Sequence, residues 1–318
     1  MLVFALKHTR DFGERVAAAL GVELAPCEER EFEDGEHKAR PLVEVRGRDC
    51  YVIQSLHGGP DASGNDKLAR LLFFAGALRD HGAARVTAVV PYLAYARKDR
   101  VTKPRDPVIT RYVAQLFEAV GIAGVVTLEV HNVAAFQNAF RIPTLHLESA
   151  EIFASRAGEL AGAGPVVVAS PDPGGVKRAQ LFRETLEARL NREFGAAYLE
   201  KRRSAGVVSG SMLAGEVRGA TVFLVDDLIS TGGTMLRAAQ TCLAAGATKV
   251  YAFAAHGLFN ASASEVIENP AFAATIITDT VPPLRLSAAA RERVQIVSAA
   301  PLFAGAIRQV HAGAVGGT

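Results

Sequence analysis

Two adjacent carboxylates followed by hydroxyl and glycine residues form the stretch of this sequence with the clearest chemistry. Asp226 and Asp227 come directly after Thr221–Val225, a run with the composition of a buried strand. The small and polar residues that follow are Ser230, Thr231, Gly232, Gly233 and Thr234. Glycines and a helix N-terminus present N–H groups to a phosphate, and carboxylates accept hydrogen bonds from sugar hydroxyls. The stretch therefore predicts a sugar-phosphate site; the alternative is an ordinary capped turn between strand and helix.

Basic residues follow another apolar run of the sequence. Arg97, Lys98 and Arg100 come soon after Val86–Val90, a β-rich run that stops at Pro91. Guanidinium and ammonium groups at the carboxyl end of a parallel strand are well placed to bind anionic phosphates. These residues predict a second phosphate site, and a solvated basic turn is the alternative on the residues alone.

Three further groups could take part in phosphate chemistry. Glu129 and His131 lie two residues apart at the end of the apolar run Val125–Val130, so in a strand both side chains would point the same way. Asp172 lies in a turn rich in proline and glycine that follows the apolar run Val166–Ala169. Lys201–Arg203 is a run of three basic residues, which by itself usually indicates solvated surface.

Strand-like apolar runs alternate with helical stripes along the chain, and these elements must position the polar groups. The runs Cys50–Ser55 and Val86–Val90 flank a helical stripe of leucines and alanine, and the second half repeats this rhythm. We therefore predict two similar three-layer α/β domains, each a mainly parallel sheet with helices on both faces. We place the domain boundary between residues 1–149 and 150–318, where the elements of the first predicted sheet end and those of the second begin. The last residues of the chain could pack back on the N-terminal domain.

The composition excludes several classes of protein. Of the 318 residues, 49% are hydrophobic and 21% are charged, which is enough apolar side chain for a core and excludes a disordered chain. No apolar run approaches the ~18 residues of a membrane span, and no secretory signal is seen at the start of the sequence. The formal net charge of +2 gives no reason to expect nucleic acid or a membrane as partner. Three cysteines without C-x-x-C spacing fit the reducing cytoplasm.

The Asp226–Thr234 stretch resembles the loop that binds 5-phosphoribosyl 1-diphosphate (PRPP) in type I phosphoribosyltransferases and in ribose-phosphate pyrophosphokinases. The other motifs select the pyrophosphokinases, because Phe32–Glu36 resembles their F-x-D-G-E motif and Pro91–Arg100 their P-Y-x-x-Y-A-R-Q-D-R motif. Further resemblances occur in the family's order. They are Glu129–His131, Ser170–Val176, Lys201–Arg203 and Tyr251–Gly257.

The resemblance implies the type I phosphoribosyltransferase fold and a role for each matching residue. The residues implied to bind ATP are Phe32, Asp34, Glu36, Arg97, Lys98, Asp99 and His131. Those implied to bind ribose 5-phosphate are Asp226, Asp227, Ser230, Thr231, Gly232, Gly233 and Thr234. Mg²⁺ would lie near His131 and Asp172, and Lys201 and Arg203 would stabilise charge in the transition state.

Several positions depart from the family's usual motifs. Lys98 stands in place of Gln and could add a phosphate contact or crowd the base, and Asn132 stands where Ala is usual. Ser230 stands where bacterial and animal members commonly carry Asp, so the loop is more similar to that of archaeal-type members.

The activity implied by the resemblance is diphosphoryl transfer from ATP to ribose 5-phosphate, giving PRPP and AMP, in a cytoplasmic homo-oligomer between a dimer and a hexamer. Two rival functions stay open. A phosphoribosyltransferase would share the PRPP loop but would not need the motifs at Phe32–Glu36 and Arg97. A non-catalytic regulatory relative would be expected to have lost catalytic cations or metal ligands. The residues implied for these roles, Lys201, Arg203, Asp172 and His131, are all present.

Overall fold

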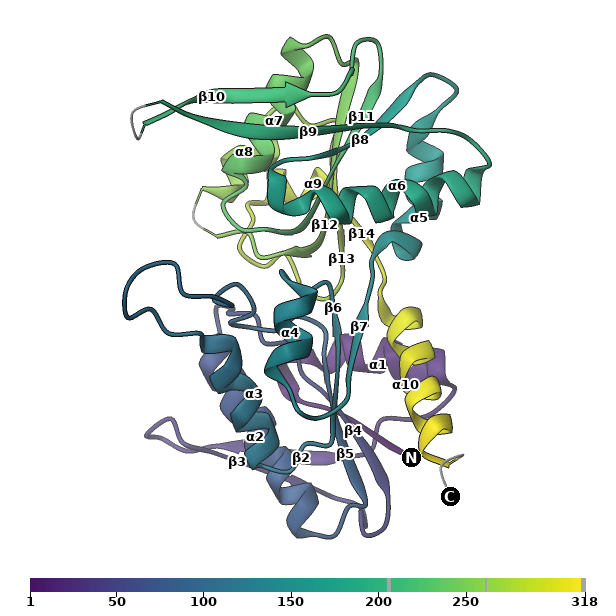
Figure 1. Ribbon diagram of the computed structural model, residues 1–318. Coiled ribbons are helices and arrows are strands. Elements are labelled where there is room, and N and C mark those ends of the chain that lie inside the picture. The colour runs from purple at the N-terminus through teal and green to yellow at the C-terminus, as the bar shows by residue number, and fades with distance from the viewer. Residues whose placement is uncertain (205–206, 261, 316–318) are drawn as a thin grey trace. The chain divides into compact units, whose positions relative to one another are not determined.

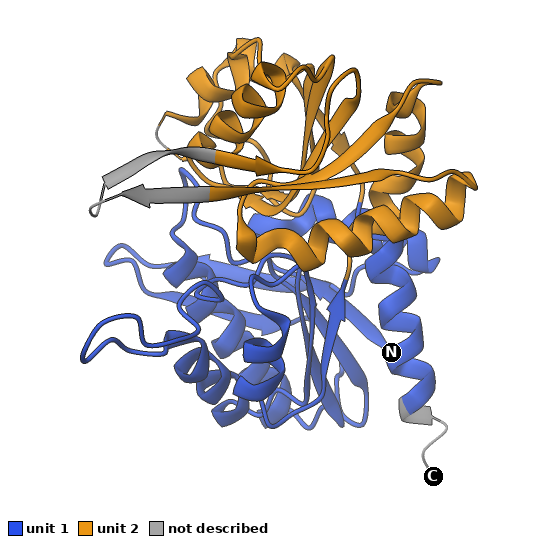
Figure 2. Ribbon diagram, turned by 45° about the horizontal axis from the view of Figure 1, so that its top comes forward, with its two compact units in different colours: residues 1–147, 299–318 blue, residues 148–298 orange. Residues whose placement is uncertain are grey.

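The chain divides into two compact units that are each built around a parallel sheet. The computed structural model describes residues 1–204, 207–260 and 262–315, with the side chains of all of these except 201–211, 314 and 315. The first unit contains residues 1–147 together with 299–318, and the second contains residues 148–298 (Figure 2). The C-terminal segment thus belongs to the first unit, and the second unit ends before the end of the chain.

The first unit has a fully parallel sheet of five strands (Figure 1). In spatial order the strands are β1 (Leu2–Ala5), β4 (Asp49–Ile53), β5 (Arg85–Val90), β6 (Gly124–Leu128) and β7 (Thr144–Leu147). A separate antiparallel hairpin consists of β2 (Cys27–Glu31) and β3 (His37–Pro41). The apolar runs form the buried strands as predicted, because a parallel sheet covered on both faces needs continuous apolar sequence.

Helices cover both faces of the first sheet. The helices and the short 3₁₀ turn of this unit are η1 (Lys7–Thr9), α1 (Arg10–Leu20), α2 (Gly64–Asp80), α3 (Ile109–Ala119), α4 (Val133–Ala139) and α10 (Ala300–Val315). Apolar residues of α2, α3 and α4 share one core with Phe4 and Val52 of the sheet. On α1, a Cβ at Gly13 would lie 2.2 Å from the Cβ of Ala5, so this helix packs closely against β1. α10 packs on α1 through an edge-to-face contact of Phe12 with Phe303.

The second unit has a seven-stranded sheet that is parallel except at one edge. Its strands in spatial order are β10 (Val207–Ala214), β9 (Gly195–Ser204), β8 (Val166–Ser170), β11 (Thr221–Ile229), β12 (Lys249–Gly257), β13 (Ala274–Thr278) and β14 (Val294–Val297). β9 and β10 form an antiparallel hairpin at that edge. The central strands carry the loops that the sequence singled out.

Successive residues of the second sheet face different helices. The helical elements of this unit are α5 (Ala150–Ala161), η2 (Pro173–Gly175), α6 (Val176–Leu190), α7 (Gly233–Ala244), α8 (Ala263–Glu268) and α9 (Ala288–Glu292). Val168 of β8 packs in a core with Phe153 of α5 and Phe182 of α6. Val167 packs in another core with residues of α7, α8 and α9. This alternation produces the three layers that the sequence predicts.

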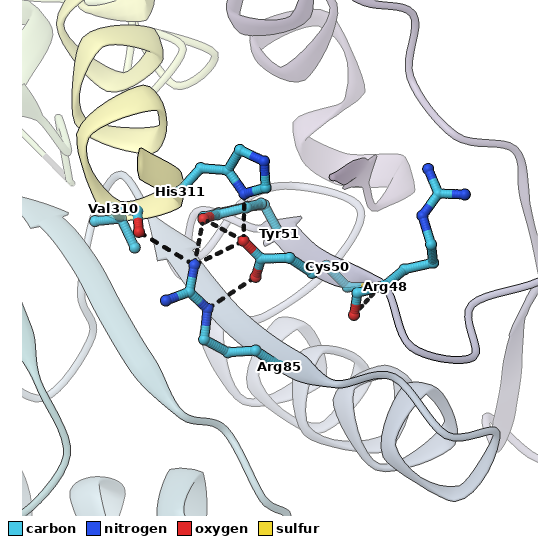
Figure 3. A network of polar contacts seen from close by, with 7 residues as sticks. Arg48, Cys50, Tyr51, Arg85, Val310 and His311 are labelled. Carbon is cyan, nitrogen blue, oxygen red and sulfur yellow. Dashed lines mark hydrogen bonds and ion pairs between the residues drawn. The ribbon is translucent and has the colours of Figure 1, made fainter. Parts of the chain in front are cut away.

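The C-terminal helix is fixed to the first sheet by a polar network (Figure 3). The Asp49 carboxylate accepts hydrogen bonds from Arg85 Nε at 2.8 Å and from the Tyr51 hydroxyl at 2.9 Å, and it contacts His311 Nδ1 at 2.6 Å. Arg85 Nη2 also donates to the Val310 carbonyl at 3.2 Å. Burial opposes ionisation of Asp49, but hydrogen bonds from Arg85, His311 and Tyr51 hold its pKa below the usual value.

Two sequence-level expectations concern the membrane and the thiols. In the part of the chain that the structure describes, no helix combines the length and the apolar character needed to cross a bilayer. All three cysteines are among the described residues, and all three are free thiols.

Candidate active site

The F-x-D-G-E residues form the tip of the β2–β3 hairpin. Asp34 Oδ1 accepts a hydrogen bond from the Glu36 backbone N–H at 3.1 Å, and Gly35 takes a left-handed φ of +88° that closes the turn. The Phe32 ring is 42% exposed, and the Arg30 guanidinium lies 5.2 Å from its centroid. The hairpin therefore presents an accessible aromatic face, which is a suitable surface for stacking on a planar base.

A buried arginine of α2 fastens this hairpin to the first unit. Arg70, whose side chain is 6% exposed, pairs with Glu31, and its Nη1 lies 4.0 Å from Glu29 Oε2. Burial raises the pKa of Glu29, although the Lys7 backbone N–H donates to its carboxylate at 2.5 Å. Sequence reasoning missed Arg70, because it stands within a helical stripe and outside every motif.

Arg97 lies on the loop between β5 and α3, and its side chain is exposed. Tyr95 has a left-handed φ of +65°. The Thr110 hydroxyl at the start of α3 donates to the carbonyls of Tyr95 at 3.0 Å and Lys98 at 3.2 Å. These bonds hold the backbone on both sides of Arg97, so the guanidinium extends from a fixed segment.

The Lys98 ammonium is engaged within this loop. Lys98 Nζ lies 2.5 Å from Asp106 Oδ2, which also accepts hydrogen bonds from Thr102 and from the Lys103 backbone N–H. The Lys98 hydrogen bond and those of Thr102 hold the pKa of Asp106 below its usual range. A contact between Lys98 and a phosphate stays a prediction.

The segment at Glu129–His131 differs from the expected strand. β6 ends at Leu128, and Glu129 takes a left-handed φ of +43°. The expectation that Glu129 and His131 share one side of a strand is wrong, because this backbone reversal ends the two-residue alternation. Glu129 is buried, whereas His131 is exposed beside Asn132, which caps α4.

The loop that the sequence predicts to bind a sugar phosphate joins β11 to α7 in the second unit. β11 continues through Asp226 and Asp227 to Ile229. The prediction that the two acids follow the strand is therefore wrong, because they lie within it. Gly232 has a φ of +79°, and a Cβ there would lie 2.6 Å from Val266 Cγ1. Gly232 is also the N-cap of α7, where no side chain caps the helix. The first N–H groups of α7 are therefore available to an anion.

A basic residue that the sequence analysis missed faces the two acids of β11. Arg178 of α6 has its Nη1 3.6 Å from Asp226 Oδ1 and its Nη2 3.9 Å from Asp227 Oδ2. Burial raises the pKa of Asp226 well above its usual value, and the neighbouring Asp227 charge adds to this effect while Arg178 opposes it. Two adjacent acids that face one guanidinium can accept hydrogen bonds from the hydroxyls of a sugar.

Two more basic residues lie against the loop and were also missed. The Ser230 hydroxyl accepts a hydrogen bond from Asn260 Nδ2 at 3.2 Å, and Asn260 is bonded to Arg285. Arg237 Nη2 donates to the Thr234 hydroxyl at 3.3 Å. Arg237 follows Thr234 by three residues on a helix, so its spacing was a usable signal; Arg285 is distant in sequence and gave none.

Asp172 caps the short turn after β8. Its Oδ1 accepts hydrogen bonds from the N–H groups of Gly174 at 2.9 Å and Gly175 at 3.2 Å. A Cβ at Gly175 would lie 2.6 Å from Ser170 Oγ, so glycine is required for the packing of this turn. The other predicted residues of this unit, Lys201 and Arg203, have their backbones in β9, and their side chains lie outside the described residues.

Comparison with known proteins identifies the family. Residues 1–121 match the model of the N-terminal domain of ribose phosphate pyrophosphokinase, and residues 209–317 match that of the phosphoribosyl synthetase-associated domain. A protein of Caldanaerobacter subterraneus subsp. tengcongensis named ribose-phosphate pyrophosphokinase is 38% identical, over 98% of this chain and 95% of that protein. The chain belongs to the ribose-phosphate pyrophosphokinase family.

Other members of the ribose-phosphate pyrophosphokinase family agree with this assignment. A ribose-phosphate pyrophosphokinase of Wolinella succinogenes is 36% identical, over 95% of this chain and 93% of that protein. The crystal structure of phosphoribosylpyrophosphate synthetase from Mycobacterium smegmatis aligns with a TM-score of 0.86 at 30% identity, covering 98% of this chain and 99% of that chain. The predicted family and the predicted two-part α/β fold are both confirmed.

The resemblance to ribose-phosphate pyrophosphokinases implies that Mg²⁺ binds near His131 and Asp172. Within residues 1–204, 207–260 and 262–315, no group of three or more His, Cys, Asp or Glu side chains is arranged to hold a metal ion. Mg²⁺ commonly binds through one or two carboxylates and completes its shell with substrate phosphates and water. The half-buried Asp172 carboxylate fits such a shell better than the His131 imidazole, because Mg²⁺ prefers oxygen ligands.

Proposed function

We propose that the protein is a ribose-phosphate diphosphokinase, which transfers the β,γ-diphosphoryl group of ATP to the C1 hydroxyl of ribose 5-phosphate and forms PRPP and AMP. The observation that carries this proposal is 38% identity to a protein of that name over 98% of the chain. The construction of the β11–α7 loop gives it independent chemical support.

Ribose 5-phosphate is the substrate that suits the β11–α7 loop. Its phosphate would accept hydrogen bonds from the first N–H groups of α7 and from the hydroxyls of Ser230, Thr231 and Thr234. Its ring hydroxyls would bond to Asp226 and Asp227, and Arg178 offsets part of the negative charge of these acids. The similarity of this loop to that of archaeal-type members is part of the proposal.

ATP is the proposed substrate of the first unit. The Phe32 ring would stack on adenine, Asp34 and Glu36 would accept hydrogen bonds from it, and Arg97 would bind the phosphates. The proposal also assigns Lys98, Asp99 and His131 to this site.

Diphosphoryl transfer needs positioning and charge neutralisation more than covalent help. The C1 hydroxyl would attack the β-phosphorus of ATP, and AMP would leave. Lys201 and Arg203 would stabilise the charge that develops on the transferred group. Mg²⁺ held near Asp172 would supply further neutralisation of the phosphate oxygens.

The proposed reaction is tested by following AMP and PRPP with purified protein, Mg²⁺, ATP and ribose 5-phosphate. Equal amounts of AMP and PRPP are expected. Consumption of PRPP with a nucleobase and without ATP would instead indicate a phosphoribosyltransferase. Absence of AMP under every donor and sugar tried would favour a non-catalytic regulatory relative.

We also propose a cytoplasmic homo-oligomer between a dimer and a hexamer, without a nucleic acid or membrane partner. Large apolar side chains on α2 and α3 support self-association, since Phe73 is 62% exposed, Tyr112 52% and Leu116 47%. Light scattering after size-exclusion chromatography measures the assembly, and a monomer at micromolar concentration would contradict it.

A further inference from the structure

The side chain of Asn132 uses both ends of its amide. Its Oδ1 accepts a hydrogen bond from the Ala135 backbone N–H at 3.1 Å and caps α4. Its Nδ2 donates to Asp99 Oδ2 at 2.8 Å, across 33 positions of sequence. One residue thus satisfies a helix end and holds a residue of a distant loop.

The two loops joined by this bond carry residues proposed to bind ATP. Asp99 lies two positions after Arg97, and Asn132 directly follows His131. The two loops follow β5 and β6, which are neighbouring parallel strands whose carboxyl ends lie at the same edge of the sheet. The Asn132–Asp99 bond therefore fixes the spacing between the backbones that present Arg97 and His131.

The remainder of the Arg97 loop is held from other sides. The Lys98–Asp106 ion pair closes residues 98–106 on themselves, and the Thr110 hydroxyl bonds to the carbonyls of Tyr95 and Lys98 from α3. Asn132 adds an attachment to α4. A loop fixed in this way loses less conformational entropy when a ligand binds, which favours affinity.

We infer that Asn132 is a positioning residue for the nucleotide, which holds the Arg97 loop against the start of α4 through Asp99. The inference rests on the proposed function for the assignment of the ATP site. It depends on the side chains of Asn132 and Asp99, which both belong to the first unit. The motif that this segment resembles usually has alanine at the position of Asn132, and alanine could not make this hydrogen bond.

Asn132→Asp separates the two roles of this side chain. The aspartate keeps the oxygen that caps α4, since Asp is as good an N-cap as Asn. It removes the amide donor and places a carboxylate against that of Asp99. We expect the KM for ATP to rise about tenfold, which is the effect of one hydrogen bond to a charged group. The KM for ribose 5-phosphate should stay close to wild type.

An Asp99→Asn background provides the matched control. There the amide sits on the opposite side of the pair and can donate to the new aspartate, so Asn132→Asp should change the KM for ATP less than twofold. An equal rise in both backgrounds would overturn the inference, because the effect would not pass through Asp99. An unchanged KM in the wild-type background would overturn it too.

Amide hydrogen exchange tests the attachment without using activity. Exchange of the Thr102 and Lys103 amides, which bond to Asp106 inside the loop, should be faster in Asn132→Asp and restored in the Asp99→Asn background. Unchanged exchange would contradict the role of Asn132. A wild-type protein that forms no AMP would contradict the proposed function, while the exchange data would still decide whether Asn132 holds the loop.

Discussion

Arg178 of α6 faces both acids of β11, with its guanidinium nitrogens 3.6 Å from Asp226 Oδ1 and 3.9 Å from Asp227 Oδ2. Arg178→Met retains most of the side-chain volume but leaves the two acids without this cation. We expect the free energy of unfolding to fall by about 1–2 kcal/mol at pH 8, below the ~3–5 kcal/mol of a fully buried pair because these side chains are partly exposed.

The loss of stability in Arg178→Met should shrink as the pH falls, because burial raises the pKa of Asp226 and the protonated acid needs less compensation. Urea denaturation at pH 5 and pH 8 measures the difference. Lys177→Met provides the control, because this cation lies one position earlier on α6 and is exposed. A loss that does not depend on pH would show that Arg178 stabilises the fold through packing alone.

Asp226→Asn should stabilise the protein at neutral and alkaline pH. Because burial and the Asp227 charge raise the pKa of Asp226, the folded state favours its protonated form. The stability that the protonated Asp226 contributes to the wild-type fold is present below the pKa of the unfolded state, ~3.9, and is lost as the pH rises through the folded pKa. The unfolding free energy of the variant should thus exceed that of wild type increasingly between pH 5 and pH 8.

At alkaline pH the difference in unfolding free energy between Asp226→Asn and wild type is about 1.4 kcal/mol for each unit by which folding raises the pKa of Asp226. Asp80→Asn removes an exposed carboxylate and should produce no such trend. A gap that stays constant from pH 5 to pH 8 would contradict a raised pKa. The variant should also bind ribose 5-phosphate less tightly at alkaline pH, because a neutral amide accepts weaker hydrogen bonds from hydroxyls than an ionised carboxylate does.

The buried parallel strands could be predicted from sequence, and the polar elements could not. Val166–Ala169 and Val222–Val225 are continuous apolar runs, which is the pattern of strands covered on both faces. The strands β2 and β3 read CEERE and HKARP, so no apolar period reveals them. They form because Arg70 and a tight turn at Gly35 hold them, and these are interactions between distant residues.

The same distinction applies to the candidate site. The order of motifs was enough to predict the family and the residues of the β11–α7 loop. It could not reveal Arg178, Arg285 or the Asn132–Asp99 bond, because each depends on elements that meet only in the folded chain. Local backbone geometry was also out of reach, since nothing in the sequence indicates a left-handed conformation at Glu129.

Arg70→Met should release the hairpin that carries Phe32, Asp34 and Glu36. The substitution leaves Glu29, whose side chain is 9% exposed, without its cationic partner. Removing one member of a buried pair costs about 3 kcal/mol, so the unfolding midpoint should fall. Exchange of the amides of residues 27–41 should become faster, and the KM for ATP should rise.

Arg40→Met is the matched control for Arg70→Met, because Arg40 pairs with Glu28 on the same hairpin but is 57% exposed. Exposed pairs contribute little to stability, so this variant should resemble wild type. Equal losses in the two variants would mean that burial of Arg70 is not what holds the hairpin.

His311→Phe should loosen the attachment of α10 to the first sheet. The variant keeps a ring near Tyr51 but removes a hydrogen bond to Asp49, so we expect a loss of about 1–2 kcal/mol in unfolding free energy. The partners of Asp49 lower its pKa. The stability that the ionised Asp49 contributes to the fold is therefore present above the unfolded pKa of ~3.9 and is lost as the pH falls through the folded pKa.

The difference between His311→Phe and wild type should therefore be smaller at pH 3 than at pH 6, as measured by chemical denaturation. Gln309→Ala, at an exposed position of the same helix, provides the control and should have little effect. Greater stability of His311→Phe at pH 6 would contradict the assigned role of the network.

Gly232→Ala should destabilise the protein and weaken binding of ribose 5-phosphate. The added Cβ would lie 2.6 Å from Val266 Cγ1, and the φ of +79° is unfavourable for alanine. The left-handed conformation costs about 1–2 kcal/mol, and the contact with Val266 adds to this cost. Thermal unfolding and the KM for ribose 5-phosphate measure the two effects.

Gly76→Ala should have the opposite effect on stability, because Gly76 lies within α2 with nothing within 4 Å of an added Cβ. Alanine stabilises a helix interior by about 0.5–1 kcal/mol relative to glycine. Adding Val266→Ala to Gly232→Ala should recover only the part of the loss caused by the contact. Full recovery would show that the backbone at position 232 can relax, and that the loop does not depend on its left-handed conformation.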